Sequence, residues 1–173
     1  MTDFARLMSD YFVKYLAGQK GSGSNTMKTY RDTFVQLLEF MDEKKHIRAD
    51  CIEVDSFSYD IINEFLEYLE KEKRVSISTR NNRLAAIRSF FKYTGYHEPK
   101  YLNISTSIRE ISKKKTEGRQ MNYLSVNAME HFLNSFDKTD HKELRCFCIV
   151  LLLYESGARV TELCNVRRYD LQD

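Results

Sequence analysis

Apolar residues recur at three-to-four-residue spacing along most of this 173-residue chain, and this periodicity is the feature that most constrains its fold. The spacing is that of an α-helix with one buried face. One proline and six glycines leave few points at which helices must break. Because 42% of the residues are hydrophobic and 13% are aromatic, the chain can form a packed core. The sequence therefore predicts an all-α fold.

The first 95 or so residues predict four helices in a compact bundle. The first two are expected over residues 3–19 and 24–45, where the apolar stripes run. The fourth is expected to stop at Gly95, because glycine commonly follows a helix C-terminus. Residues that favour N-caps precede the second, third and fourth helices: Ser24 or Asn25, Ser56 or Ser58, and Ser78 or Thr79.

A polar, basic and aperiodic stretch divides the chain after Pro99, which is expected to end the bundle. We predict a first domain over residues 1–112, a basic linker over 113–120 and a second domain over 121–173. Three helices are expected in the second domain. They begin near Ser125, near His141 and at Arg159.

The stretch Cys146–Tyr154 is apolar on every side and is interpreted as a buried core helix. It is shorter than the roughly 18 apolar residues that a membrane span needs. Two short neighbouring helices cannot cover it, so the second domain is expected to be incomplete. The N-terminus lacks the apolar region of a signal peptide, and we expect a cytoplasmic protein without a membrane partner.

The four cysteines show no Cys-x-x-Cys spacing, which argues against a zinc site. Three of them stand among apolar residues. We interpret all four, Cys51, Cys146, Cys148 and Cys164, as buried reduced thiols.

Charge is distributed unevenly although the net charge is only +2. Residues 71–119 hold thirteen Lys and Arg against four acidic residues, so the rest of the chain is acidic overall. A basic central third between acidic flanks is typical of a nucleic-acid-binding surface. The alternative is an ordinary solvated face without a partner.

The segment Glu155–Leu163 joins a glycine turn to a new helix that begins with Arg159. Glu162 follows three residues later, which places both side chains on one helical face. An arginine on such a corner suits a fixed anion such as phosphate, because its planar fork donates two parallel hydrogen bonds. The alternative is a surface arginine paired with a nearby carboxylate.

Residues 151–163, followed by Asp170-Leu171, resemble the first catalytic-arginine box of the tyrosine recombinases, the phage-integrase family. That box has an apolar helix, then Tyr-x-x-Gly-x-Arg-hydrophobic-x-Glu-Leu, then an aspartate. Ser24–Arg31 resembles the start of the family's N-terminal DNA-binding helices, and Ser78–Tyr93 resembles its major DNA-contacting helix. The three matches occur in the family's order over almost the whole chain.

The resemblance implies a phosphodiester exchange in which a tyrosine attacks phosphorus and arginines stabilise the charge on the non-bridging oxygens. Arg159 would be the first of two such arginines, and Glu162 would orient neighbouring basic groups. Neither ATP nor a metal is implied, because the bond energy is kept in a phosphotyrosyl link. The family's lysine hairpin, His-x-x-Arg box and nucleophilic tyrosine are not found in these 173 residues.

DNA contacts are expected from the basic and polar positions of the matching segments and of the linker. On the fourth helix we expect Arg80, Arg83 and Arg88 to face a groove, away from the buried residues. The set comprises Thr26, Lys28, Thr29, Arg31, Thr79, Arg80, Asn82, Arg83, Arg88, Lys113, Lys114, Lys115 and Arg119.

The resemblance thus implies an all-α SAM-like core-binding domain, followed by the first helices of a mixed α/β catalytic domain. The function implied is site-specific DNA recombination or integration, with double-stranded DNA and other recombinase protomers in a tetramer as partners. The segment from Thr79 to Phe91 looks more like mobile-element integrases than Xer recombinases. One alternative is a short regulator that binds DNA or a recombinase without cutting, and another is a helical protein-interaction module.

Overall fold

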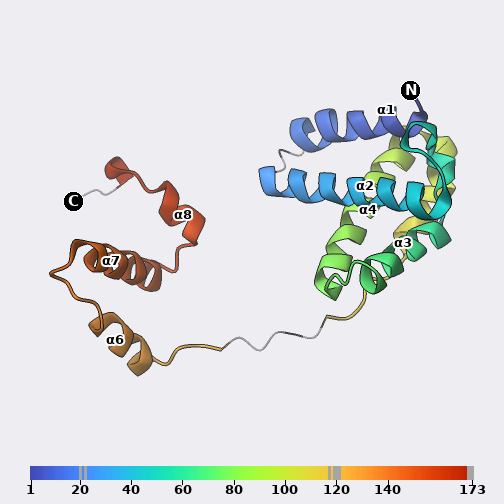
Figure 1. Ribbon diagram of the computed structural model, residues 1–173. Coiled ribbons are helices and arrows are strands. Elements are labelled where there is room, and N and C mark those ends of the chain that lie inside the picture. Colours follow the sequence, from blue (N-terminus) through green and yellow to red (C-terminus); the bar gives the residue numbers. More distant parts are fainter. Residues whose placement is uncertain (20, 22, 117, 119–121, 171–173) are drawn as a thin grey trace. The chain divides into compact units, whose positions relative to one another are not determined.

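The computed structural model describes residues 1–19, 21, 23–116, 118 and 122–170, and every regular element within them is helical (Figure 1). The predicted all-α class is confirmed. The chain divides into two units, Met1–Glu117 and Gly118–Asp173, which are described separately. The division falls inside the stretch that the sequence predicted as a linker, residues 113–120.

The first unit opens with α1 (Asp3–Asp10), which continues directly into a π-helix, η1 (Tyr11–Gln19). The sequence predicted one regular helix over residues 3–19, so this change of helix type is a correction. Tyr11 and Leu16 are both fully buried although they lie five residues apart. The wider turn of a π-helix, with i→i+5 hydrogen bonds, brings two such positions to the same face.

The next two α-helices are α2 (Ser24–Lys45) and α3 (Tyr59–Lys71). The bounds of α2 confirm the predicted range of 24–45. Two short 3₁₀ helices, η2 (Ala49–Cys51) and η3 (Val54–Ser56), connect α2 to α3. Ser58 caps α3 by accepting a 3.2 Å hydrogen bond from the Ile61 N–H, as one of the two predicted caps.

The long helix α4 (Ile77–His97) begins after the N-cap Ser76 and runs through Gly95. The prediction that this helix stops at Gly95 is wrong. A Cβ atom at this position would lie 2.6 Å from the Cβ of Ser105 on the neighbouring helix. Glycine is needed here because the two helix backbones approach closely, and not because the chain must turn.

Pro99 does not end the unit, contrary to the sequence prediction. It opens a 3₁₀ helix, η4 (Pro99–Tyr101), which leads into α5 (Leu102–Glu110). Proline is favoured at a first helical position because its missing N–H has no partner there. The unpredicted α5 packs along α4 and buries Ile108, and Ile111 after it is also buried.

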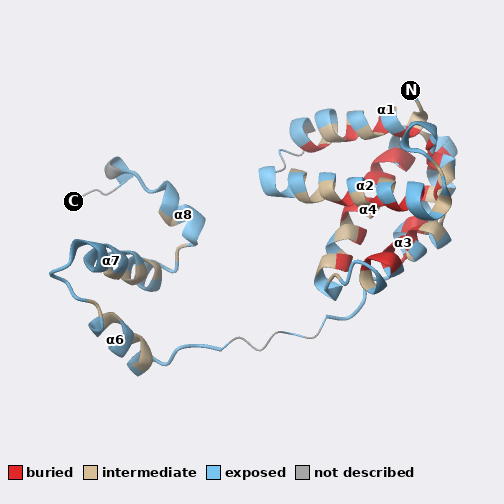
Figure 2. Ribbon diagram, in the orientation of Figure 1, coloured by how far each residue is buried: buried red, intermediate tan, exposed pale blue. Residues whose placement is uncertain are grey.

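Phe90 lies near the centre of the hydrophobic core of the first unit. Its ring centroid lies 5.3–5.5 Å from those of Phe4, Tyr11, Phe34 and Phe91. All four pairs are edge-on, an arrangement that adds to the stabilisation that burial gives. In Figure 2 the buried residues gather where α1, α2, α3 and α4 face one another.

The second unit contains α6 (Val126–Asn134), α7 (His141–Ser156), α8 (Val160–Asn165) and the 3₁₀ helix η5 (Arg168–Asp170). Ser125 caps α6, and Gly157 ends α7 with a φ of 61°. No residue of these three α-helices is buried among the residues that the structure describes (Figure 2).

The interpretation of Cys146–Tyr154 as a buried core helix is therefore wrong for the described chain, because α6 and α8 touch only part of α7. The four cysteines, predicted as buried, are all exposed. Three of them lie in the weakly packed second unit, and Cys51 lies on a surface 3₁₀ turn. No helix in the described residues has the length and apolar character required to cross a membrane.

Candidate nucleic-acid interface

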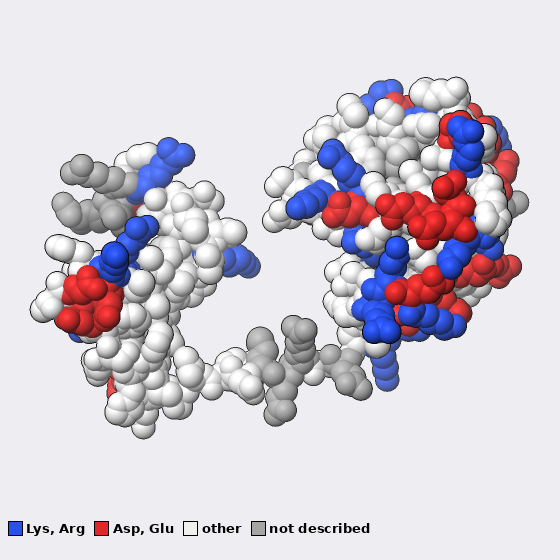
Figure 3. All heavy atoms as spheres, in the orientation of Figure 1, with Lys and Arg blue, Asp and Glu red and all other residues white. Residues whose placement is uncertain are grey.

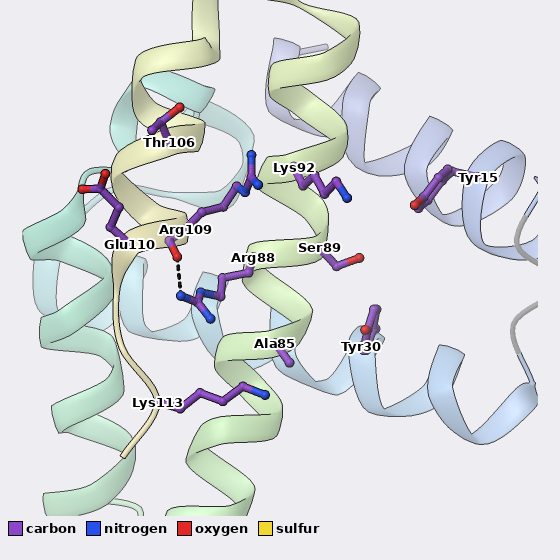
Figure 4. Close-up of a pocket in the computed structure, with 10 residues that line it drawn as sticks. All are labelled: Tyr15, Tyr30, Ala85, Arg88, Ser89, Lys92, Thr106, Arg109, Glu110 and Lys113. Carbon is purple, nitrogen blue, oxygen red and sulfur yellow. Dashed lines mark hydrogen bonds between the residues drawn. The ribbon is translucent and has the colours of Figure 1, made fainter. Parts of the chain in front are cut away.

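An open pocket of about 640 Å³ lies beside α4 in the first unit, and we call it the basic pocket. Its walls come from η1, α2, α4, α5 and the segment that follows α5 (Figure 4). Four cations and one carboxylate line it. The lining residues are Tyr15, Tyr30, Ala85, Arg88, Ser89, Lys92, Thr106, Arg109, Glu110 and Lys113.

Helix α4 contributes two small residues and two long cationic residues to the basic pocket. Ala85 and Ser89 are small and lie one turn apart, on the side of α4 toward the two tyrosines in Figure 4. Arg88 and Lys92 carry long cationic side chains from the same stretch of the helix. Small side chains beside these cations leave room for a large anionic ligand to approach the helix closely.

The remaining cations come from chain that is distant in sequence from α4. Arg88 donates a hydrogen bond from Nη2 to the main-chain oxygen of Arg109, which ties α4 to α5 (Figure 4). Lys113 extends toward α4 from the segment after α5, whereas the side chain of Glu110 extends away from these cations. The pocket therefore carries a net positive charge that suits phosphate groups.

Burial raises the pKa of two phenols of the first unit, that of Tyr11 well above its usual range and that of Tyr93. Neither of these two tyrosines lines the basic pocket.

The structure corrects the predicted position of Arg80. Its side chain is 6% exposed, forms an ion pair with Glu70 (3.2 Å) and donates from Nη1 to the Ser112 carbonyl oxygen (3.2 Å). Arg80 lies one helical turn before Leu84, on the face that packs inward. It is therefore not a surface arginine that faces a groove.

Arg83 also has partners inside the protein. Its Nη1 donates to the main-chain oxygen of Thr29 (2.9 Å) and to Oγ1 of Thr33 (3.1 Å), both on α2. The three predicted arginines of α4 thus connect it to three different helices, α3, α2 and α5. Of these arginines, Arg88 also lines the basic pocket.

The other predicted DNA contacts have varied surroundings. Thr29 and Thr79 are half-buried, and their hydroxyls hydrogen-bond to Asn25 O and Ser76 Oγ. Arg119 lies outside the described residues. The exposed members of the set are Thr26, Lys28, Arg31, Asn82, Lys113, Lys114 and Lys115.

Sequence reasoning missed Lys92, Arg109 and the two tyrosines of the basic pocket. Lys92 could have been found, because it follows Arg88 by four residues on the same helix. Arg109 could not, because the helix that carries it, α5, was itself not predicted. Tyr15 and Tyr30 belong to the apolar stripes of the first two predicted helices, where they are expected to face the core, and the structure places them half-buried at its edge.

The second predicted site is in the other unit, at the start of α8. Arg159 is the N-cap residue, and its backbone N–H donates to Glu162 Oε2 at 2.8 Å. Its guanidinium Nη1 forms an ion pair with Glu162 Oε1, also at 2.8 Å. The Arg159 backbone N–H and then its guanidinium hold the pKa of the Glu162 carboxyl below its usual value.

The pairing of Arg159 with Glu162 matches the alternative that the sequence left open, a surface arginine beside a carboxylate. The side chains are 82% and 53% exposed, so a phosphate could reach the guanidinium. The catalytic role of both residues stays a prediction.

Comparison with known proteins identifies the family. Residues 10–99 match the family described as "Phage integrase, N-terminal SAM-like domain". The matched residues span η1, α2, α3 and α4. The chain belongs to this phage-integrase family, as the sequence motifs predicted.

Relatives extend the similarity over nearly the whole chain. The putative integrase/recombinase y4rC of Sinorhizobium fredii is 28% identical over 96% of this chain and 50% of its own length. The putative integrase/recombinase y4rD of the same organism is 29% identical over 97% of this chain and 60% of its own length. The tyrosine recombinase XerC of Staphylococcus aureus is 26% identical over 95% of this chain and 52% of its own length.

The chain thus spans about half the length of the curated relatives it matches. No solved structure matches it.

Proposed function

We propose that this chain supplies the DNA-binding unit and the first active-site arginine of a tyrosine recombinase that carries out site-specific DNA recombination or integration. The observation that carries the proposal is the basic pocket, which is lined by four cations from α4, α5 and the segment after α5 together with small residues of α4. Family membership supports the same assignment, because the relatives are integrases and recombinases.

Duplex DNA fits this surface better than a small anion does. The pocket is open, and its cations are spread along α4 from Arg88 to Lys92 and along α5 toward Lys113. Cations at such spacing can contact successive phosphates, while the small Ala85 and Ser89 allow the helix to approach the groove edge. By contrast, Asp and Glu gather over α2 on the face of the first unit shown in Figure 3.

The chemical role proposed for the second unit rests on Arg159. Its guanidinium would donate to the non-bridging oxygens of the phosphate under attack, where negative charge grows in the transition state. Glu162 would hold the guanidinium in place beforehand. The attacking tyrosine, the second arginine and the tetrameric assembly with other recombinase protomers belong to the proposed complete enzyme.

The test of DNA binding is the salt dependence of affinity for a duplex, measured by fluorescence anisotropy on the full chain. Replacing Lys92 and Arg109 with Ala should weaken binding and lower the log–log salt slope by about 1.8, since each phosphate contact contributes about 0.9. Lys44→Ala/Lys45→Ala is the matched control. These lysines pair with Glu72 and Glu64 at the far end of α2.

Both double variants lose two positive charges. An equal loss of affinity in both would show that net charge, and not the basic pocket, binds DNA.

The alternative function is a regulator that occupies DNA or binds a recombinase without cutting. The 173 residues contain no His-x-x-Arg box and no tyrosine in the family's nucleophile context, so we expect this chain alone to form no covalent link to DNA. A suicide DNA substrate on a denaturing gel tests this. A covalent band that disappears when one tyrosine of the chain is changed to Phe would contradict the expectation.

A further inference from the structure

The short segment Ser112–Lys114, which we call the strap, follows α5 and is fastened to the first unit. Asn81 of α4 makes two hydrogen bonds to the main chain of Lys114. Its Nδ2 donates to the Lys114 carbonyl oxygen at 2.8 Å, and its Oδ1 accepts from the Lys114 N–H at 3.1 Å. One side-chain amide thus satisfies both main-chain groups of a residue that the sequence assigned to a linker.

Two further contacts attach the strap to α4 and α3. Buried Arg80 donates to the Ser112 carbonyl oxygen, and the Lys114 ammonium forms a 2.7 Å ion pair with Glu70. Glu70 also pairs with Arg80, so one carboxylate of α3 holds both cations. Ile111, immediately before the strap, is buried. The strap is therefore attached at its start, at its end and through a side chain.

This attachment determines where the neighbouring lysine lies. Lys114 reaches toward Glu70, whereas Lys113 lines the basic pocket together with Arg88 and Arg109 (Figure 4). A lysine in a mobile segment would bring a diffuse charge, and ordering it on DNA would cost conformational entropy. A strap that is already ordered removes that cost.

We infer that Asn81 is a positioning residue, whose clamp on the Lys114 main chain places Lys113 as the fourth cation of the DNA-binding pocket. Asn81 itself is not required to touch DNA. The part of the inference that concerns DNA rests on the proposed function. The clamp itself stands on the geometry of the first unit.

The clamp can be tested without DNA, by limited trypsin digestion of the full chain with mass-spectrometric detection of cleavage after Lys113 and Lys114. Trypsin needs a locally unfolded segment, so cleavage reports opening of the strap. Asn81→Ala should speed cleavage at these bonds by about tenfold, because two hydrogen bonds are lost. Asn103→Ala, a change at an exposed asparagine of α5, is the matched control and should cleave like the parent chain.

Asn81→Asp keeps the acceptor for the Lys114 N–H but places a carboxylate oxygen against the Lys114 carbonyl oxygen, where two acceptors repel, so its cleavage rate should also exceed that of the parent chain. Equal rates for the parent chain and Asn81→Ala, with circular dichroism showing both folded, would overturn the clamp.

DNA binding then tests the consequence for Lys113. Asn81→Ala and Lys113→Ala should each lower the salt slope by about 0.9, and the double variant should lose no more than Lys113→Ala alone. Additive losses would overturn the positioning role while leaving the proposed function intact. If the parent chain does not bind duplex DNA, the proposed function fails, and the trypsin result still decides whether the clamp exists.

Discussion

The two units of this chain are both helical, yet they differ in how their helices are stabilised. In the first unit, α1 to α5 enclose a core of buried aromatic and aliphatic side chains around Phe90. In the second, α6, α7 and α8 have well-formed caps, and none of their residues is buried among those the structure describes. Regular hydrogen bonding and good caps therefore do not by themselves create a core.

The difference shows which forces act in each unit. A helix of sixteen residues such as α7 is only marginally stable when it is not packed, because nucleation is costly. The helices of the first unit gain most of their stability from apolar burial. The four predictions below test this contrast, from the largest expected effect to the smallest.

Hydrogen exchange of the intact chain should separate the two units most clearly. Amides in α4 should exchange through unfolding of the first unit and be protected by a factor of about 10³ or more, given ordinary domain stabilities. Amides in α7 should exchange far faster. Equal protection of the α4 and α7 amides at low protein concentration would contradict the claim that the second unit is less stable than the first. Protection of α7 that grows with concentration would indicate self-association through its apolar side chains.

A matched pair of substitutions should show the contrast in free energy. Phe90→Ala should destabilise the first unit by about 3–5 kcal/mol, because it removes a fully buried ring. Phe132→Ala on α6, where the residue is 45% exposed, should leave the unfolding transition of the first unit unchanged. Urea denaturation followed by circular dichroism measures both. A comparable loss from the two substitutions would show that the second unit shares the stability of the first.

The close approach of α4 and α5 gives the next effect. Gly95→Val should destabilise the first unit by about 2–3 kcal/mol, because the new side chain would overlap Ser105. Gly118→Val is the control, since a Cβ there meets no atom within 4 Å. Thermal denaturation of both variants decides the matter. If Gly95→Val melted at the parent temperature, the helix contact would have to be looser than described.

The smallest effect concerns one carboxylate in each unit. Hydrogen bonds from Lys100 and Tyr101 lower the pKa of Asp3, and the backbone and guanidinium of Arg159 lower that of Glu162. Because both pKa values are lowered in the folded chain, the stabilisation is present above the ordinary carboxyl pKa and is lost as the pH falls through the lowered value.

A carbon-detected NMR titration should find both midpoints below their ordinary values of 3.8 and 4.5. Arg159→Ala should raise the pKa of Glu162 partway and leave that of Asp3 unchanged. A Glu162 midpoint that does not move would show that the guanidinium contributes nothing to it.

Local sequence signals predicted the elements that depend on local physics. The bounds of α2, the cap Ser58 and the start of a helix near Ser125 follow from periodicity and from the preference of serine for N-caps. The Arg159–Glu162 pair follows from i, i+3 spacing. In each case the interacting residues lie within a few positions of one another.

What the sequence could not predict depends on partners far along the chain. Gly95 was taken for a helix end, because nothing local shows that Ser105 will pack against it. The inward role of Arg80 depends on Glu70 and Ser112, which lie ten and thirty-two residues away. The change from α-helix to π-helix at Tyr11 places Tyr11 and Leu16 in a core whose other residues come from distant parts of the chain.

The cap of α8 separates the fold of this segment from its proposed chemistry. Glu162 accepts its hydrogen bond from the main-chain N–H of residue 159, a group that every amino acid except proline provides. The helix start would survive if the arginine were replaced, although the proposed phosphate contact would be lost. If the proposed function holds, a single substitution at this corner would remove the chemistry and leave the fold intact, so correct folding of such a variant would not show that it can cut DNA.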